Sequence, residues 1–288
     1  MPAVDVHQHL WPELLIEALA RRRRPPRLRG STLHLAGREG LEIDLGAHAL
    51  DARLALLDRC ELDVAVVSLS PTLGLDDLAA EEAAELAGAY ERGILELSAE
   101  ARGRIVPLAA GPSVEGFAGW CVRAAALTEL DSYASLLDQL EHRGAFLFVH
   151  PGPSRPPAGA PAWWAEVVDQ TAQMQAAYAA WLAHGAERWP GLRVVFALLA
   201  GGGPFQLERL QSQGVSGRDS LHENVLFETA SYGRRALELC LSTLGVGQVL
   251  FGSNAPRLDP KRGLDDVRSF GDAVVDALWN QNPSRLLG

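Results

Sequence analysis

The sequence lacks the features that mark several large protein classes. It has only three cysteines, Cys60, Cys121 and Cys240, which lie far apart and form no C-x-x-C pair. They predict neither a disulfide framework nor a thiolate zinc site, and they fit a protein of the reducing cytoplasm. No run approaches the roughly 18 consecutive apolar residues of a membrane span. The N-terminus shows no basic segment followed by an apolar one, so secretion is not expected.

An excess of positive charge is also missing. The chain has 26 lysines and arginines against 36 acidic residues, which gives a formal net charge of −10. This balance argues against a general nucleic-acid surface, so the expected partner is a small molecule rather than nucleic acid or a membrane. What the chain does have is a hydrophobic fraction of 48% with 22% charged residues, as expected for a soluble globular protein with a sizeable core.

Short apolar runs alternate with stretches of helical periodicity along the whole chain. Buried parallel strands have such continuous apolar runs, and their alternation with helices predicts an α/β fold, a single (β/α)₈ TIM barrel domain over residues 1–288. The expected strands are 3–9, 64–69, 104–109, 117–122, 146–150, 193–199, 224–229 and 248–252. The expected helices are 11–24, 47–60, 75–101, 132–142, 163–188, 205–213, 232–244 and 264–279, with a short tail at 283–287.

Two places depart from a regular barrel. Residues 32–35 and 41–43 flank a glycine-containing turn, which predicts a small β-hairpin inserted after the first strand. The connection between the third and fourth strands is much shorter than the dozen or so residues that a parallel crossover needs. Either the third helix is missing and an extended link replaces it, or the fourth strand is misplaced.

The first strand carries an unusual set of polar residues. Side chains two apart on a strand share a face, so Asp5, His7 and His9 are expected to point one way. Three titratable groups on one face are costly to bury unless something pairs with them. Two imidazoles at this spacing can bind one divalent cation. The alternative is a pair of partly exposed histidines at a strand end.

A third histidine is expected near the first two. His9 ends the first strand and His150 ends the fifth, and in such barrels the C-terminal strand ends meet at one mouth and carry the chemistry. His7, His9 and His150 therefore form a candidate metal site, in which each imidazole needs an acceptor on its other nitrogen. The alternative for His150, which precedes Pro-Gly, is a capping or packing role.

Several segments taken in order resemble the amidohydrolase superfamily, in the branch that includes aminocarboxymuconate-semialdehyde decarboxylase and related aromatic-acid decarboxylases and hydrolases. The segments that carry the resemblance are 5–9 (DVHQH), 148–152 (FVHPG), 193–197 (RVVFA), 224–229 (NVLFET), 250–256 (LFGSNAP) and 282–288 (NPSRLLG). The resemblance covers nearly the whole chain. It implies a (β/α)₈ barrel with one divalent metal ion, commonly zinc, and often a homodimer.

The resemblance assigns the metal ligands and shows two departures. His7 and His9 match the first-strand ligands, and His150 matches the fifth-strand ligand. The family's sixth-strand histidine, next to the metal water, falls on Leu198 here, and its eighth-strand aspartate falls on Asn254. Leucine can neither accept nor deliver a proton, and asparagine cannot do so as a carboxylate does. Asn254 is still expected in the catalytic site, where its amide oxygen could serve as a weak fourth metal ligand.

Three further residues are candidates for the site. Glu228, near the end of the seventh strand, is the candidate catalytic acid–base group; its alternative is a salt-bridged or surface carboxylate. Trp163 and Trp164 lie where this branch often places a substrate-packing aromatic residue; their alternative is packing at a helix start. Two functions remain open. The first is a metal-dependent hydrolase or decarboxylase for a small carboxylate or lactone-like substrate, with altered proton transfer. The second is a catalytically degenerate barrel that binds a ligand or partner.

Overall fold

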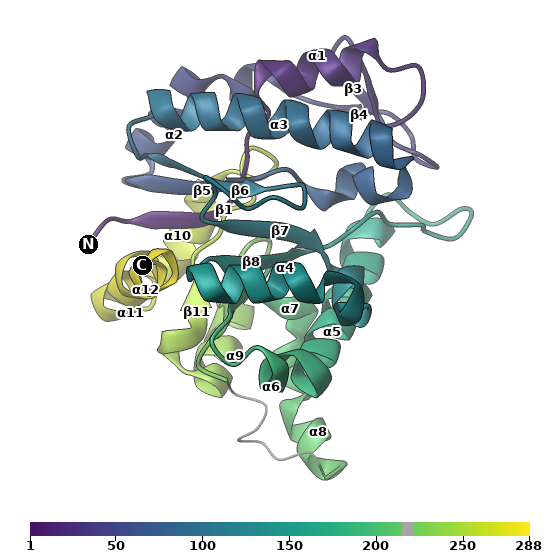
Figure 1. Cartoon of the computed structure of the whole chain (residues 1–288). Coiled ribbons are helices and arrows are strands. Elements are labelled where there is room, and N and C mark those ends of the chain that lie inside the picture. Colours follow the sequence, from purple (N-terminus) through teal and green to yellow (C-terminus); the bar gives the residue numbers. More distant parts are fainter. Residues whose placement is uncertain (215–221) are drawn as a thin grey trace.

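A barrel of eight parallel strands forms the centre of the computed structural model, which describes residues 1–214 and 222–288 (Figure 1). The barrel closes where the amide of Val6 donates to the carbonyl of Phe251 at 2.9 Å and the amide of His9 donates to that of Ala255 at 2.7 Å. The predicted (β/α)₈ fold is confirmed. In barrel order the strands are β1 (Val4–His9), β5 (Val64–Ser68), β6 (Ile105–Ala109), β7 (Gly119–Arg123), β8 (Phe146–His150), β9 (Arg193–Phe196), β10 (Val225–Glu228) and β11 (Val249–Leu250).

Helices surround this barrel, and Figure 1 shows α1 to α3 on one side of the strands and α4 to α9 on the other. The strands are buried along nearly their whole length because both of their faces contact protein, which explains their continuous apolar runs. The helices are α1 (Glu13–Arg21), α2 (Leu50–Arg59), α3 (Ala80–Glu100), α4 (Leu130–Arg143), α5 (Gln170–Ala180), α6 (Ala186–Arg188), α7 (Leu199–Gly202), α8 (Leu207–Ser212), α9 (Arg234–Leu244), α10 (Pro260–Arg268), α11 (Asp272–Asp276) and α12 (Asn282–Leu287).

A small antiparallel sheet follows α1, as the sequence predicts. It consists of β2 (Arg27–Arg29), β3 (Thr32–His34) and β4 (Leu41–Glu42), with Leu33 paired to Leu28 on one side and to Leu41 on the other. The hairpin formed by β3 and β4 is confirmed, whereas β2 was not predicted. We call this element the insertion sheet.

The third helix of the barrel is missing, which decides between the two sequence interpretations. No helix lies between β6 and β7, and residues 110–118 form an irregular link instead. The carboxylate of Glu91 on α3 accepts hydrogen bonds from the amides of Ala110 and Gly111 at 3.1 and 2.8 Å, and Val114 is buried. Two backbone donors and one apolar anchor therefore hold the link where a helix would otherwise lie.

Most predicted elements differ from the observed ones by a few residues at their ends, and two differ for a clear backbone reason. The strand expected over 193–199 ends at Phe196, because the chain enters a turn of positive φ at Leu198. The helix expected over 264–279 is interrupted after Arg268, and α11 begins after Gly271, whose φ of 91° does not fit a right-handed helix.

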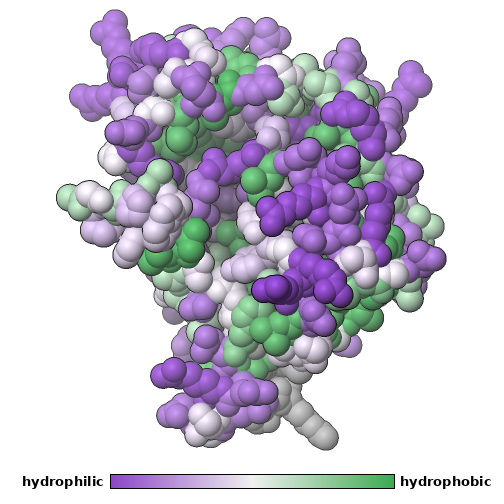
Figure 2. Space-filling model, turned by 180° about the vertical axis from the view of Figure 1, so that it is seen from behind, coloured by the Kyte–Doolittle hydropathy of each residue, from purple (hydrophilic) through white to green (hydrophobic). Residues whose placement is uncertain are grey.

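No helix among the described residues is both long and apolar enough to cross a membrane. Figure 2 shows the face opposite to that of Figure 1, where hydrophilic residues are interspersed with smaller hydrophobic areas.

Candidate metal centre

Three imidazoles converge at the C-terminal mouth of the barrel. His7 and His9 come from β1 and His150 ends β8, and all three are buried. Their ring centroids lie 5.0–5.2 Å apart, and one ring nitrogen of each lies within 4.8 Å of the others. The Nε2 atoms of His7 and His9 are 3.3 Å apart. The structure thus brings together the three histidines that the sequence singled out.

The other ring nitrogen of each histidine faces an acceptor. Nδ1 of His7 lies 2.9 Å from the Glu228 carboxylate, Nδ1 of His9 lies 3.0 Å from the Ser68 carbonyl, and Nδ1 of His150 lies 2.8 Å from the carbonyl of the residue that follows it. Carbonyl oxygens only accept hydrogen bonds, and a carboxylate accepts them as well, so these contacts assign the proton to Nδ1 in each ring. Three Nε2 lone pairs then face one another.

The neutral state of the buried imidazoles favours the binding of a cation between them. Burial lowers the pKa of His150 to about 3, and burial together with His7 and His150 holds the pKa of His9 well below its usual 6.5. His9 and His150 are therefore neutral near pH 7. Lone pairs that face each other at this distance repel unless a positive charge lies between them. The donor set fits a divalent metal ion, since neutral imidazole with a fixed second hydrogen bond is a common ligand for zinc and similar ions.

One sequence prediction for β1 was wrong, because Asp5 does not share a face with the histidines. The register between β1 and β5 shifts between Asp5 and Gln8, so the strict alternation expected over residues 3–9 is interrupted by a bulge. Asp5 pairs with Ala65 and Gln8 with Val67, and both partners belong to the apolar layer beneath α2 and α3. His9 lies beyond the shift and points to the mouth.

Asp5 instead holds the seam between β1 and β11. Its Oδ1 accepts from the amides of His7 and Ser253 at 3.1 and 3.0 Å, and its Oδ2 accepts from Gln8 at 2.7 Å. Arg53 of α2 donates to the Gln8 side chain at 2.5 Å and to the His9 carbonyl at 3.0 Å. Burial raises the pKa of Asp5, and these hydrogen bonds oppose that effect. The network fixes the backbone that carries the histidines.

Glu228 ends β10 and does not line the cavity at the mouth, and its predicted role as an acid–base group stays a prediction. Its side chain is fully buried behind His7, and besides His7 it accepts from the amides of Leu198 at 2.6 Å and Ala230 at 2.7 Å. A methyl group at Gly252 would lie 2.1 Å from Glu228 Oε2 and 2.8 Å from His7 Cβ, so only glycine fits there. This geometry favours a role in orienting His7.

Two further residues lie at the mouth: Leu198 follows β9, and Asn254 follows β11. Both line the cavity and both have a positive φ, 54° at Leu198 and 63° at Asn254. Asn254 is fixed by its amide, which donates to the His7 carbonyl at 2.8 Å. Left-handed conformations are rare for leucine but are enriched for asparagine, aspartate and histidine. The backbone at these positions therefore suits a histidine and an aspartate, although the side chains differ. Metal ligation by Asn254 stays a prediction.

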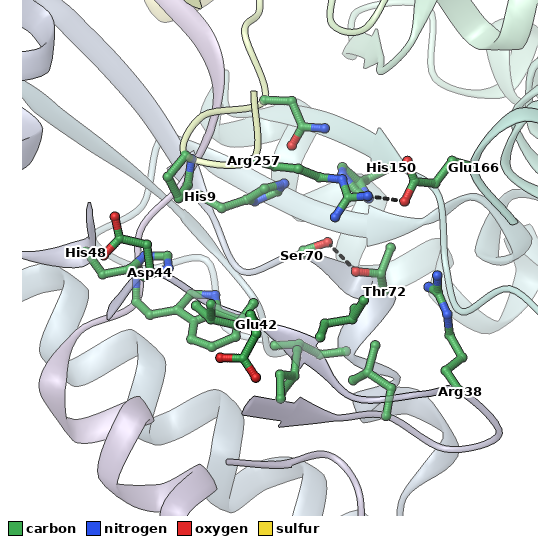
Figure 3. A pocket seen from close by; sticks show the side chains of 18 of the residues that line it. His9, Arg38, Glu42, Asp44, His48, Ser70, Thr72, His150, Glu166 and Arg257 are labelled. Carbon is green, nitrogen blue, oxygen red and sulfur yellow. Dashed lines mark hydrogen bonds and ion pairs between the residues drawn. The ribbon is translucent and has the colours of Figure 1, made fainter. Parts of the chain in front are cut away.

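A cavity of about 360 Å³ opens from His9 and His150 toward the insertion sheet. Aliphatic side chains line it beneath that sheet, and Figure 3 shows Arg257 beside His150 with its ion pair to Glu166. Arg38 lies at the far side of the cavity and has no ion pair among the residues that the structure describes. The apolar lining residues contributed by the insertion sheet and its flanks are Leu33, Leu35, Leu41 and Ile43.

Trp163 and Trp164 are placed outside the cavity lining. Trp163 is 55% exposed, and its ring lies 6.0 Å from that of Trp164, whose indole nitrogen donates to Asp169 at 3.1 Å. This arrangement agrees with packing at a helix start, and substrate contact by the pair stays a prediction.

Sequence reasoning missed the two arginines and the stacked pair of Trp11 and His48 in this cavity. Arg257 had a usable signal, because it follows the last strand at the mouth, where barrel enzymes place functional residues. Arg38 and His48 had none, since they reach the cavity only through the fold of the insertion.

A family model described as "Amidohydrolase" matches residues 4–288 of this chain. Among solved structures, the IDCase of Metarhizium anisopliae has a TM-score of 0.84 at 20% identity, with 99% of this chain and 97% of that chain covered. The 2,6-dihydroxybenzoate decarboxylase from Rhizobium has a TM-score of 0.73 at 17% identity, covering 100% and 98%.

A third solved structure is the 5-carboxyvanillate decarboxylase from Novosphingobium aromaticivorans, complexed with manganese and 4-hydroxy-3-methoxy-5-nitrobenzoic acid. It has a TM-score of 0.74 at 14% identity and covers 99% of this chain and 96% of that chain. At these identities the likeness shows the fold. No curated protein matches the sequence.

Proposed function

The chain belongs to the amidohydrolase family, and from that premise we propose that it is a metal-dependent non-oxidative decarboxylase of a small aromatic carboxylate. The observation that carries the proposal is the convergence of three buried imidazoles whose other nitrogens are all hydrogen-bonded. His7, His9 and His150 would hold the ion, with Asn254 as a weak fourth ligand. A divalent ion in such a cluster supplies Lewis acidity that polarises a bound carboxylate.

The cavity supports a carboxylate with a flat apolar body. Arg38 supplies positive charge without an ion pair among the described residues, whereas Arg257 is paired with Glu166. The leucines of the insertion sheet supply an apolar wall. The likeness to solved decarboxylases of aromatic acids favours decarboxylation over hydrolysis. Zinc as the metal, a homodimer and a cytoplasmic location are further predictions from the sequence that we retain as part of this proposal.

Proton delivery is the step for which the cavity offers the fewest side chains. When a carboxyl group leaves as CO₂, the carbon–carbon bond pair stays on the ring carbon, which must then gain a proton. Leu198 and Asn254 cannot supply it, and Glu228 is sealed behind His7. Glu166 is engaged by Arg257, so we propose that water in the cavity delivers the proton. Turnover is then slow, since a positioned acid–base group typically contributes ~10²–10⁴-fold in rate.

The test is metal analysis followed by a substrate screen. The protein is stripped with a chelator, reloaded separately with zinc and manganese, and analysed for bound metal; we expect about one ion per chain. Loaded protein is then assayed with hydroxylated and unsubstituted benzoates for loss of substrate absorbance and release of CO₂. His142→Ala is the matched control, because His142 is exposed on α4 away from the mouth. Failure to retain a stoichiometric ion after reloading contradicts the proposal.

Leu198 and Asn254 favour a second candidate, a barrel that binds a metal and a carboxylate but no longer turns it over. Both candidates predict metal and ligand binding, and they differ in catalysis. Loaded protein that binds aromatic carboxylates without releasing CO₂ supports the second.

A further inference from the structure

Trp11 and His48 form a stacked pair in the wall of the cavity. Trp11 follows β1, and His48 ends the short turn Leu45–His48 that follows the insertion sheet. Their rings lie 5.0 Å apart at an angle of 12°, each residue is only 6% exposed, and both line the cavity. Neither residue has a role in the metal cluster or in the steps described above.

The tautomer of His48 follows from one hydrogen bond. The backbone amide of Trp11 donates to Nδ1 of His48 at 3.1 Å. An amide N–H can only donate, so Nδ1 is the acceptor and the ring proton is on Nε2. Burial also lowers the pKa of His48 to about 4, in agreement with a neutral ring near pH 7.

Two polar hydrogens in this pair are unused. Neither Nε2–H of His48 nor the indole N–H of Trp11 has a hydrogen-bond partner within the described part of the chain. The indole nitrogens of Trp120 and Trp279 also lack partners, but those two are sealed inside the protein, whereas the nitrogens of Trp11 and His48 are not. Because the pair borders the cavity, its donors are available to a ligand there.

The surroundings of the pair indicate what kind of ligand group it suits. Figure 3 shows His48 on the side of the cavity opposite to Arg38, with Asp44 beside it. A second carboxylate on a ligand would be repelled by Asp44 and would find no cation in the pair itself. A hydroxyl or carbonyl oxygen needs only neutral donors, and a buried donor left unpaired costs free energy that such an oxygen recovers.

We propose that Trp11 and His48 bind a hydroxyl or carbonyl oxygen of the substrate, so that the cavity selects carboxylates that carry such an oxygen over unsubstituted ones. The inference rests on the proposed function, because the carboxylate must be seated near the histidines for the second oxygen to reach the pair. Trp11 and His48 are specificity-determining residues in this account. A site built to donate hydrogen bonds discriminates against analogues that lack the acceptor.

The test measures selectivity rather than turnover. Dissociation constants of benzoate and of the three monohydroxybenzoates are determined by calorimetry with zinc-loaded protein. One neutral hydrogen bond changes affinity roughly 2- to 12-fold. We therefore expect the best hydroxybenzoate to bind more tightly than benzoate by a factor in this range. Trp11→Phe keeps a flat ring but removes one donor, and His48→Leu removes the other. Each is expected to lower the ratio of the affinity for the hydroxybenzoate to the affinity for benzoate.

Two controls separate donation from folding. Trp279→Phe removes an indole N–H that is sealed away from the cavity and should leave the preference unchanged. His48→Gln offers both an acceptor for the Trp11 amide and an N–H donor, so it should restore part of the preference lost in His48→Leu. Melting temperature and bound zinc are measured for every variant.

The outcomes distinguish this inference from the proposed function. A hydroxybenzoate preference that Trp11→Phe and His48→Leu reduce supports the donor pair. Equal binding of benzoate and hydroxybenzoates, or a preference that both variants retain, overturns the donor pair and leaves the proposed function standing. Absence of binding for every acid overturns both.

Discussion

The strand ends of β1 and β8 differ sharply from those of β9 and β11, although all four meet at one mouth. On the first side, His7, His9 and His150 each have a fixed partner for the second ring nitrogen. On the other side, Leu198 and Asn254 line the same cavity without an acid–base group. One side of the mouth is equipped to hold a cation, and the other is not equipped to move a proton.

This difference indicates that the side chains suited to cation binding and those suited to proton transfer belong to separate parts of one barrel. Metal binding depends on three rings and the groups behind them, all of which are buried and mutually oriented. Proton transfer depends on one or two side chains at the cavity surface, which can change without disturbing the barrel, because the backbone at Leu198 and Asn254 keeps its left-handed conformation.

The largest expected effect comes from restoring the second side. Leu198→His combined with Asn254→Asp adds a titratable base and a carboxylate at positions whose positive φ both residues tolerate. We expect the rate of decarboxylation to rise by ~10²–10⁴-fold, as is typical of a positioned acid–base group. The rate is measured under single-turnover conditions with zinc-loaded protein. Leu239→His, on an exposed position of α9, is the control for adding a histidine elsewhere. If the rate does not rise in the fully metal-loaded double variant, the residues at positions 198 and 254 are not what limits proton transfer.

Removing one ligand from the first side tests its capacity to hold a cation. His150→Ala leaves two imidazoles, and we expect metal affinity to fall by more than about 100-fold, which exceeds the 10–100-fold typical of losing an outer partner alone. Competition with a chromogenic chelator measures the affinity. His142→Ala should bind metal as the unmodified protein does, and equal affinities of the two variants would refute the ligand assignment.

A smaller loss is expected from the group behind the ligand. Glu228→Gln keeps the shape of the side chain but weakens acceptance from the His7 ring and from the two amides. We expect metal affinity to fall about 10–100-fold. Glu187→Gln, an exposed position on α6, is the matched control. Glu228 would be a catalytic rather than a positioning residue if the variant bound metal normally but lost turnover.

The pH dependence of stability, measured without metal, probes two histidines of this cluster, His9 and His150, together with His48 in the cavity wall. Burial lowers the pKa values of His9, His48 and His150, the last two to about 4 and about 3. Below pH 6.5 the unfolded chain binds protons at these rings and the folded chain does not, so stability falls as the pH decreases from 6.5 toward 4. The loss is at most about 1.4 kcal/mol per pH unit for each ring.

Asp5 acts in the opposite direction, because burial raises its pKa, but one carboxyl group opposes three imidazoles. Urea unfolding of chelator-treated protein at several pH values measures the effect. A free energy of unfolding that stays constant between pH 7 and pH 5 would contradict this account.

The smallest expected effect concerns the turn that carries Leu198. Gly201 has a φ of 60°, and an added methyl group would lie 2.5 Å from the Thr171 carbonyl oxygen. Gly201→Ala should therefore cost more than the ~1–2 kcal/mol of a left-handed alanine. Gly103→Ala, where φ is 88° and nothing lies within 4 Å, should cost only that strain. Thermal unfolding compares the two, and equal costs would show that the turn relaxes easily.

The alternation of apolar runs and the histidines on β1 and β8 could be predicted because local pattern decides them. A strand buried on both faces needs apolar residues throughout, and a barrel places all its strand ends at one mouth. The extended link was predictable in the same way, as one of two options, since the connection is too short for a helix. The orientation of Asp5 was not predictable, because a bulge in the pairing of β1 with β5 reverses the face.

The sequence by itself indicated the barrel and the two strands that carry the candidate ligands, because apolar runs and the spacing of residues along them are local patterns. Its resemblance to the amidohydrolase superfamily implied the two replaced acid–base positions, Leu198 and Asn254. Tertiary structure alone decided that Glu228 lies behind His7, that Arg53 fixes the β1 backbone and that His48 stacks on Trp11. Those contacts join residues far apart in the chain. Their formation depends on the packing of whole elements, which no local pattern of residues records.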